Sequence, residues 1–178
     1  GVGTDNVDLA AAQARGIIVT NTPGANATAV AELTVALLLL LARPVLSAAA
    51  ATREGGWPRT SGLSLSGKTV GLVGFGAIGR SVAQLLRGFG CRLLAADPWC
   101  DLDRAAGLGV SVVALDALLG GSDFVSLHAP VTPKTRGMVD AAFLARMRPG
   151  AALVNTARGE LVDEVALYEA LASGRVRG

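Results

Sequence analysis

A glycine-rich stretch at residues 69–80, TVGLVGFGAIGR, constrains the fold more than any other part of the sequence. Residues 69–73 form an aliphatic, β-branched run that is typical of a buried strand, and residues 80–87 place apolar side chains at helical spacing. Between them, Gly74 permits a sharp turn, Gly76 lets the backbone approach a pyrophosphate, and Gly79 lets the helix pack closely on the strand. The helix N-terminus also offers free N–H groups to phosphates. The stretch therefore predicts a dinucleotide-binding turn.

An acidic residue supports this interpretation over a purely structural turn. Asp97 follows a second predicted strand, residues 91–96, and lies close to the spacing of about 20 residues at which such folds hold the ribose 2′-hydroxyl. A carboxylate there repels a 2′-phosphate, and no Arg or Lys immediately follows it. We therefore expect NAD rather than NADP.

The remaining pattern predicts an α/β fold, a doubly wound parallel sheet. Further strands are expected at residues 110–113, 123–127 and 151–155, and they alternate with helices at 115–119, from about 140, and at 163–172. Residues 98–109 and 131–136 are expected as loops. Ligands bind at the carboxyl ends of such strands, where residues 74–79, 97, 128–130 and 156–158 all fall.

The N-terminal third contains a long apolar helix. Residues 1–16 are expected to form a glycine loop and a short helix, capped by Thr4 or Asp5 and ended by Gly16, before a short strand at 17–20. Asn26 or Thr28 is expected to cap a helix over residues 29–53 that Pro44 kinks, followed by a loop at 54–66. Because this helix is apolar nearly all round, we expect it to be buried between domains or subunits.

Composition and charge exclude several classes of protein. The chain is 51% hydrophobic, which fits a parallel sheet buried on both faces or an apolar surface covered by a partner subunit. The longest apolar run, residues 35–42, is far shorter than the ~20 residues of a membrane span. The net charge is only +2, with scattered basic residues, so nucleic-acid binding is not expected. Cys91 and Cys100 have no CxxC or His/Cys cluster around them, which favours reduced thiols in a cytoplasmic protein without a metal site.

Several segments together resemble a known family. GVGTDNVDL, NTPGANATAVAE, GKTVGLVGFGAIG, SLHAPVTPKTRGMV and LVNTARGELVDE resemble the D-isomer-specific 2-hydroxyacid dehydrogenases, and within them the D-3-phosphoglycerate dehydrogenase branch. The resemblance implies a nucleotide-binding domain inserted into a substrate domain. Residues 1–20 would end the first substrate-domain segment, residues 21–53 would form the crossover with the long helix that packs in a homodimer, and residues 54–178 would form the NAD-binding Rossmann domain, truncated at its C-terminus.

The motif and the resemblance together define the expected site. Arg158 matches the family's catalytic arginine, which binds and polarises the 2-oxo or 2-hydroxy acid, and Val2 and Gly3 would offer N–H groups to the substrate carboxylate. The expected cofactor contacts are Gly74, Gly76, Ala77, Ile78, Gly79, Asp97, His128, Ala129, Pro130, Thr135, Thr156, Ala157 and Arg158.

The only histidine, His128, is not expected to be the general acid or base. The family's catalytic histidine and the glutamate paired with it match positions beyond Gly178, whereas His128 matches a residue at a strand end beside the nucleotide. Glu160 and Glu164 likewise do not match the catalytic glutamate. We therefore expect residues 1–178 to bind the nucleotide with negligible turnover.

The resemblance implies an NAD-dependent oxidoreductase that moves hydride between nicotinamide and a D-2-hydroxy acid. Two alternatives remain at this point. One is a non-catalytic, NAD-sensing scaffold like the corepressor branch of the same superfamily. The other is a different Rossmann enzyme, such as a methyltransferase that uses S-adenosylmethionine, against which Gly79 and the NTARG segment argue.

Overall fold

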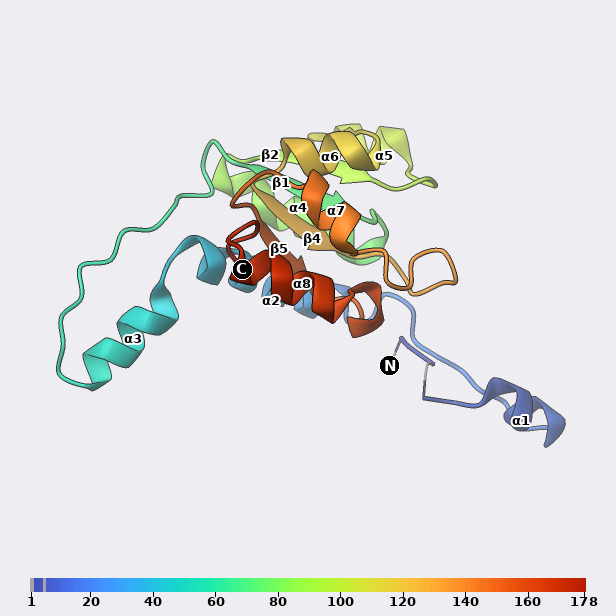
Figure 1. The fold of residues 1–178 in the computed structure, drawn as a ribbon. Coiled ribbons are helices and arrows are strands. Elements are labelled where there is room, and N and C mark those ends of the chain that lie inside the picture. Colours follow the sequence, from blue (N-terminus) through green and yellow to red (C-terminus); the bar gives the residue numbers. More distant parts are fainter. Residues whose placement is uncertain (1, 5) are drawn as a thin grey trace.

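A five-stranded parallel sheet forms the centre of the molecule (Figure 1). The computed structural model describes residues 2–4 and 6–178. The sheet has the order β3-β2-β1-β4-β5, and its strands are β1 (Thr69–Val73), β2 (Arg92–Ala96), β3 (Val110–Val112), β4 (Phe124–Leu127) and β5 (Ala152–Asn155). All four pairings are parallel. This is the order of a Rossmann sheet, so the predicted fold class is confirmed.

Helices cover both faces of the sheet. The first face carries α2 (Ala27–Ala42), α4 (Ala77–Leu86) and α5 (Leu102–Gly107), whose buried residues join one apolar cluster. The second face carries α6 (Leu115–Gly121), α7 (Ala141–Arg146) and α8 (Glu164–Ala172), which contribute to a second cluster. Successive side chains of β1 point to opposite faces of the sheet, so Val70 and Leu72 belong to the first cluster and Val73 belongs to the second.

Three short segments were not predicted. Residues 102–107 form α5 within the expected loop, because Asp101 caps the helix by accepting a hydrogen bond from the Arg104 N–H. A 3₁₀ turn, η2 (Gly159–Leu161), follows β5, and another, η1 (Arg87–Phe89), extends α4. At the C-terminal end of the sequence, residues 175–178 run beside β5, and Arg177 N donates a hydrogen bond to Ala151 O at 3.0 Å.

The long helix predicted at residues 29–53 is two helices. α2 ends at Ala42, Pro44 follows, and α3 (Val45–Arg53) continues at 71° to α2. Proline removes a backbone donor and clashes with the preceding turn, which explains a break rather than the predicted kink. α2 begins at Ala27 without a side-chain cap, so neither Asn26 nor Thr28 has the expected capping role. α3 has no buried residue and projects from the sheet (Figure 1).

The N-terminal segment also differs from expectation. α1 (Leu9–Ala14) is capped by Asp8, whose carboxylate accepts from Ala11 N at 2.8 Å, instead of by Thr4; Asp5 lies outside the described residues. Gly16 ends the helix with φ of 65°, as predicted. Residues 17–20 do not form the predicted strand, because no strand of the described sheet lies beside them, and Ile18 is 88% exposed.

No single helix of residues 2–4 and 6–178 is long and apolar enough to cross a membrane. α2 and α3 meet the length and composition of a span only when both are counted, and they are sharply bent against each other.

Candidate functional site

The glycine turn after β1 is packed against the end of β4. Gly74 has φ of +92°, and a Cβ there would lie 2.7 Å from Ala129 N and from His128 C. A Cβ on Gly79 would lie 2.5 Å from Gly74 O. Both positions therefore require glycine, one for the turn and the close approach to β4, the other for the approach of α4.

Gly76 differs from these two glycines because the space beside it is open. A Cβ built on Gly76 meets no atom of residues 2–4 and 6–178 within 4 Å, and its φ of −71° is accessible to any residue. Gly76 is the N-cap of α4, and among the described residues no side chain caps this helix. The first N–H groups of α4 therefore face open space beside an exposed Ala77 and a half-buried Ile78. This arrangement fits a pyrophosphate bound at the helix N-terminus.

Asp97 holds the glycine turn to the end of β2. Its Oδ2 accepts a hydrogen bond from Phe75 N at 2.7 Å, and its Oδ1 accepts from Trp99 N at 2.8 Å. Each carboxylate oxygen keeps a further acceptor position, so Asp97 can still accept from ribose hydroxyls. The sequence predicted a ribose contact for Asp97 but not this support of the turn.

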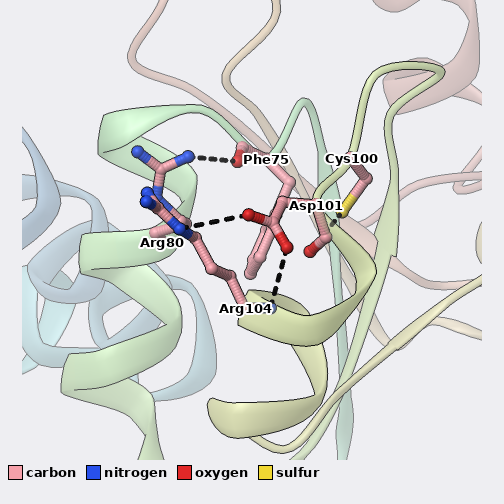
Figure 2. Close-up of polar contacts among 5 residues, drawn as sticks. All are labelled: Phe75, Arg80, Cys100, Asp101 and Arg104. Atoms are coloured by element: carbon pink, nitrogen blue, oxygen red, sulfur yellow. Dashed lines mark hydrogen bonds and ion pairs between the residues drawn. The ribbon is translucent and has the colours of Figure 1, made fainter.

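Figure 2 shows two polar contacts near the glycine turn, one that Arg80 makes to the turn itself and one between Arg104 and Asp101 of the neighbouring α5. Arg80 donates to Phe75 O at 3.3 Å, which holds the turn from its α4 side, and Arg104 pairs with Asp101 at 3.1 Å. Burial, and then the carboxylates of Asp97 and Asp101, raise the pKa of the Cys100 thiol, so this thiol is protonated at neutral pH.

At the end of β4, His128 is a half-buried imidazole that is neutral at neutral pH. Its Nε2 lies 3.0 Å from the Oγ of Ser126, which is fully buried. Burial lowers the pKa of His128 to about 4. Within the described part of the chain, the buried Nδ1 has no hydrogen-bond partner. A buried polar atom without a hydrogen-bond partner lowers the stability of the fold.

The loop after β4 is closed by hydroxyl groups. Thr135 Oγ1 donates to Pro130 O at 2.6 Å and accepts from Thr132 N at 2.8 Å. Thr135 was predicted to contact the nucleotide, and its hydroxyl in this structure is engaged in shaping the loop.

The turn after β5 is held by Asn155, a residue that was not predicted to belong to the site. Asn155 Nδ2 donates to Arg158 O at 2.8 Å, and Asn155 Oδ1 accepts from Ala157 N at 3.0 Å. Asparagine forms such local turns readily, and its place at a strand end was the available signal. Arg158 is exposed, and its guanidinium donates to Ala157 O at 2.9 Å. Thr156 lies 2.8 Å from Thr34 of α2, measured between the Oγ1 atoms.

The structure thus brings most of the predicted residues to one edge of the sheet. Gly74 touches the end of β4 at His128 and Ala129, Asp97 bonds the glycine turn, and the pairing of Leu127 with Asn155 sets the ends of β4 and β5 side by side. Val2 and Gly3 lie on the N-terminal segment, where Asn21 Nδ2 donates to Val2 O at 3.0 Å. Their predicted contact with a substrate carboxylate remains a prediction.

No group of three or more His, Cys, Asp or Glu side chains lies close enough to hold a metal ion in residues 2–4 and 6–178. The polar groups that the described residues bring to this edge are backbone N–H groups, threonine hydroxyls, the Asp97 carboxylate, the His128 imidazole and the Arg158 guanidinium.

Comparison with known proteins identifies the family. Residues 35–178 match the family model described as the D-isomer specific 2-hydroxyacid dehydrogenase, NAD binding domain. The chain belongs to the D-isomer-specific 2-hydroxyacid dehydrogenase family. The family and the predicted cofactor, NAD, are thereby confirmed.

Relatives in this dehydrogenase family match nearly the whole chain, but the chain spans only about a third to a little over half of their own length. It is 49% identical to the D-3-phosphoglycerate dehydrogenase of Mycobacterium tuberculosis over 99% of its own length and 34% of the relative. It is 45% identical to the hydroxypyruvate reductase of Thermotoga maritima, of which it covers 57%. The apo structure of D-lactate dehydrogenase from Escherichia coli superposes with a TM-score of 0.92 at 38% identity, over 98% of this chain and 56% of that one.

Proposed function

We propose that the protein containing this chain is an NAD-dependent oxidoreductase that transfers hydride between nicotinamide and C2 of a D-2-hydroxy acid. One observation carries the proposal: the glycine turn, Asp97 and the ends of β4 and β5 lie together at one edge of the sheet. The strand order reverses there, between β1 and β4, and such a reversal is where this class of fold binds its ligand. The chain is also a member of an NAD-binding family. The relatives named above are a dehydrogenase and a reductase of substrates that fit this class.

NAD, when bound, supplies the hydride chemistry. The chain's own residues bind and orient it. The open N-terminus of α4 at Gly76 takes the pyrophosphate, Asp97 accepts from the adenosine ribose, and the nicotinamide half extends across the ends of β4 and β5. This assignment follows from the strand order, because β2 and β5 lie on opposite sides of the glycine turn.

Arg158 is proposed to bind the acid. A guanidinium is permanently charged and planar, so it pairs with a carboxylate through two parallel hydrogen bonds and polarises an adjacent 2-oxo group. Asn155 holds the backbone of the Arg158 turn, which limits the positions that the guanidinium can reach. Proton transfer needs a general acid or base, and His128 is a poor one at neutral pH because burial lowers its pKa to about 4.

We further propose that the division of the chain at residues 20 and 53 corresponds to domain boundaries, that the protein is cytoplasmic and that it forms a homodimer through α2 and α3. The free thiols of Cys91 and Cys100 support a reducing compartment. The exposed apolar side chains of α3, including Leu46 at 70% exposure, support a covered surface.

Calorimetric titration of the chain with NADH and NADPH tests the proposed cofactor site. The wild-type chain is expected to bind NADH and to discriminate against NADPH, and Asp97→Ser is expected to reduce that discrimination because the repelling carboxylate is gone. An unchanged preference in Asp97→Ser would count against the ribose assignment. Rapid turnover of any 2-hydroxy acid by residues 1–178 would contradict the expectation that catalysis needs further residues.

A further inference from the structure

Thr34 is a fully buried hydroxyl on the otherwise apolar inner face of α2. It lies between Ala31, Val35 and Leu38, which are buried members of the first apolar cluster. A hydroxyl taken out of water without hydrogen bonds destabilises a protein, so buried hydroxyls are paired. Thr34 Oγ1 has two partners: Val30 O at 2.8 Å, one helical turn earlier, and Thr156 Oγ1 at 2.8 Å, at the end of β5.

The two contacts fix the direction of both hydrogen bonds. Val30 O is a carbonyl oxygen, which only accepts, so the Thr34 hydroxyl must donate its single proton to it. Thr34 then has no proton for Thr156, and the second contact is a hydrogen bond only if Thr156 donates to Thr34. The opposite assignment would place the lone pairs of Thr34 and Val30 against each other at 2.8 Å. The protons therefore run from Thr156 to Thr34 to Val30.

This direction decides what Thr156 can do in the site. Its only proton is used inside the protein, so its hydroxyl meets a ligand with lone pairs alone. The backbone on either side is held by Asn155, which bonds Ala157 and Arg158. The hydroxyl is thus fixed both in place and in polarity, by one residue of α2 and one of β5.

We propose that Thr34 is a positioning residue, which acts through Thr156 to present a hydrogen-bond acceptor to a donor group on the nicotinamide half of NAD. The inference rests on the proposed function, which places that half of the cofactor over the ends of β4 and β5. The donor has the chemistry of an amide N–H or a ribose O–H. A ligand that ends at the pyrophosphate and second ribose, such as ADP-ribose, lacks the amide and separates these two sources.

The experiment is calorimetric titration of the chain with NADH and with ADP-ribose. Thr34→Val keeps the shape of the side chain but removes the hydroxyl, which frees the Thr156 proton to turn toward the ligand. It is expected to weaken NADH binding roughly 3- to 10-fold, the range that one hydrogen bond contributes. Thr34→Ser restores the hydroxyl and is expected to restore the affinity. Unchanged ADP-ribose affinity in Thr34→Val assigns the donor to the amide, and an equal loss assigns it to the ribose.

Thr52→Val is the matched control. Thr52 of α3 makes the same bond one turn back, to Ala48 O at 2.8 Å, but it is exposed. Its substitution is expected to leave both affinities unchanged. Unfolding followed in urea reports whether each variant keeps its fold.

A double-mutant cycle separates positioning from a general effect on the fold. Thr156→Val removes the acceptor itself, so adding Thr34→Val to it is expected to cause no further loss of NADH affinity. An additive loss in the double variant, or wild-type NADH affinity in Thr34→Val, would overturn the inference while leaving the proposed function intact. Failure of the wild-type chain to bind either ligand would overturn both. If Thr34→Val does not fold, the acceptor is tested by comparing Thr156→Val, which lacks the hydroxyl, with Thr156→Ser, which keeps it. Equal NADH affinity of these two variants would overturn the inference.

Discussion

The backbone N–H of Phe75 donates to Asp97 Oδ2 at 2.7 Å, so the glycine turn after β1 is bonded to the residue that follows β2. One carboxylate thereby holds the turn in the shape that exposes the N-terminus of α4, and it is the same carboxylate that we propose to accept hydrogen bonds from a ribose. The glycine turn and Asp97 are therefore joined by a hydrogen bond. Substitutions in the turn and at Asp97 measure the contribution of each to stability and to NADH affinity.

Replacement of Asp97 is expected to lower stability as well as NADH affinity. Asp97→Ala leaves the N–H groups of Phe75 and Trp99 without their acceptor, at a cost of about 1–3 kcal/mol in the free energy of unfolding. Urea denaturation and NADH titration measure the two effects. Asp101→Ala is the control, because Asp101 caps α5 and bonds no part of the glycine turn in the described contacts. It is expected to cost about 1 kcal/mol in stability and to leave NADH affinity unchanged; a loss of affinity equal to that of Asp97→Ala would contradict this division.

The glycines of the turn are expected to separate binding from stability. Gly79→Ala places a Cβ 2.5 Å from Gly74 O, a backbone atom, so it is expected to lower the free energy of unfolding by about 1–3 kcal/mol and to weaken NADH binding. Gly76→Ala meets open space, but alanine is a poorer N-cap than glycine, so it is expected to change stability by less than about 1 kcal/mol while blocking the approach of the pyrophosphate. Gly88→Ala, also in open space but remote from the turn, is the control for both measurements. NADH affinity in Gly76→Ala equal to that of wild type would refute the pyrophosphate position.

His128 is expected to make stability depend on pH between about 4 and 6.5. The folded state holds the pKa at about 4, below the ordinary value of 6.5, so the unfolded state binds more protons in that window. The contribution of neutral His128 to the free energy of unfolding is therefore complete above pH 6.5. It is lost as the pH falls toward 4, by at most on the order of 3 kcal/mol.

Because His128 is the only histidine, His128→Gln is expected to remove this part of the pH dependence. Urea denaturation of both proteins at pH 5 and pH 7.5 tests it. The same loss of stability at pH 5 in the variant as in wild type would show that other groups cause it.

The dimer surface is expected on α3. Leu46→Glu places a charge on a side chain that is 70% exposed in the isolated chain, so it is expected to convert a dimer to a monomer in sedimentation velocity. Leu102→Glu is the control, since Leu102 is 64% exposed but lies on α5. A wild-type chain that stays monomeric at high concentration would refute the proposed dimer of this chain.

The sequence predicted the elements that local pattern specifies. Thr69–Val73, the turn at Gly74 and the strand ending before Asp97 were found as predicted, because aliphatic runs and glycine spacing encode them directly. Residues 17–20 failed because an apolar run forms a strand only beside another strand. Pro44 marked a boundary correctly, but only the structure shows that α3 leaves the direction of α2 by 71°.

The sequence by itself determined the sheet, the glycine turn and the family, because these depend on side-chain periodicity and on residues close together along the chain. Only the tertiary structure decided that Asp97 supports the glycine turn, that burial makes His128 neutral, and that Thr34 sets the polarity of Thr156. Each of these depends on which groups meet across the sheet and how deeply they are buried. Hydrogen-bond direction and proton affinity are set by such neighbours, and no spacing in the sequence specifies them.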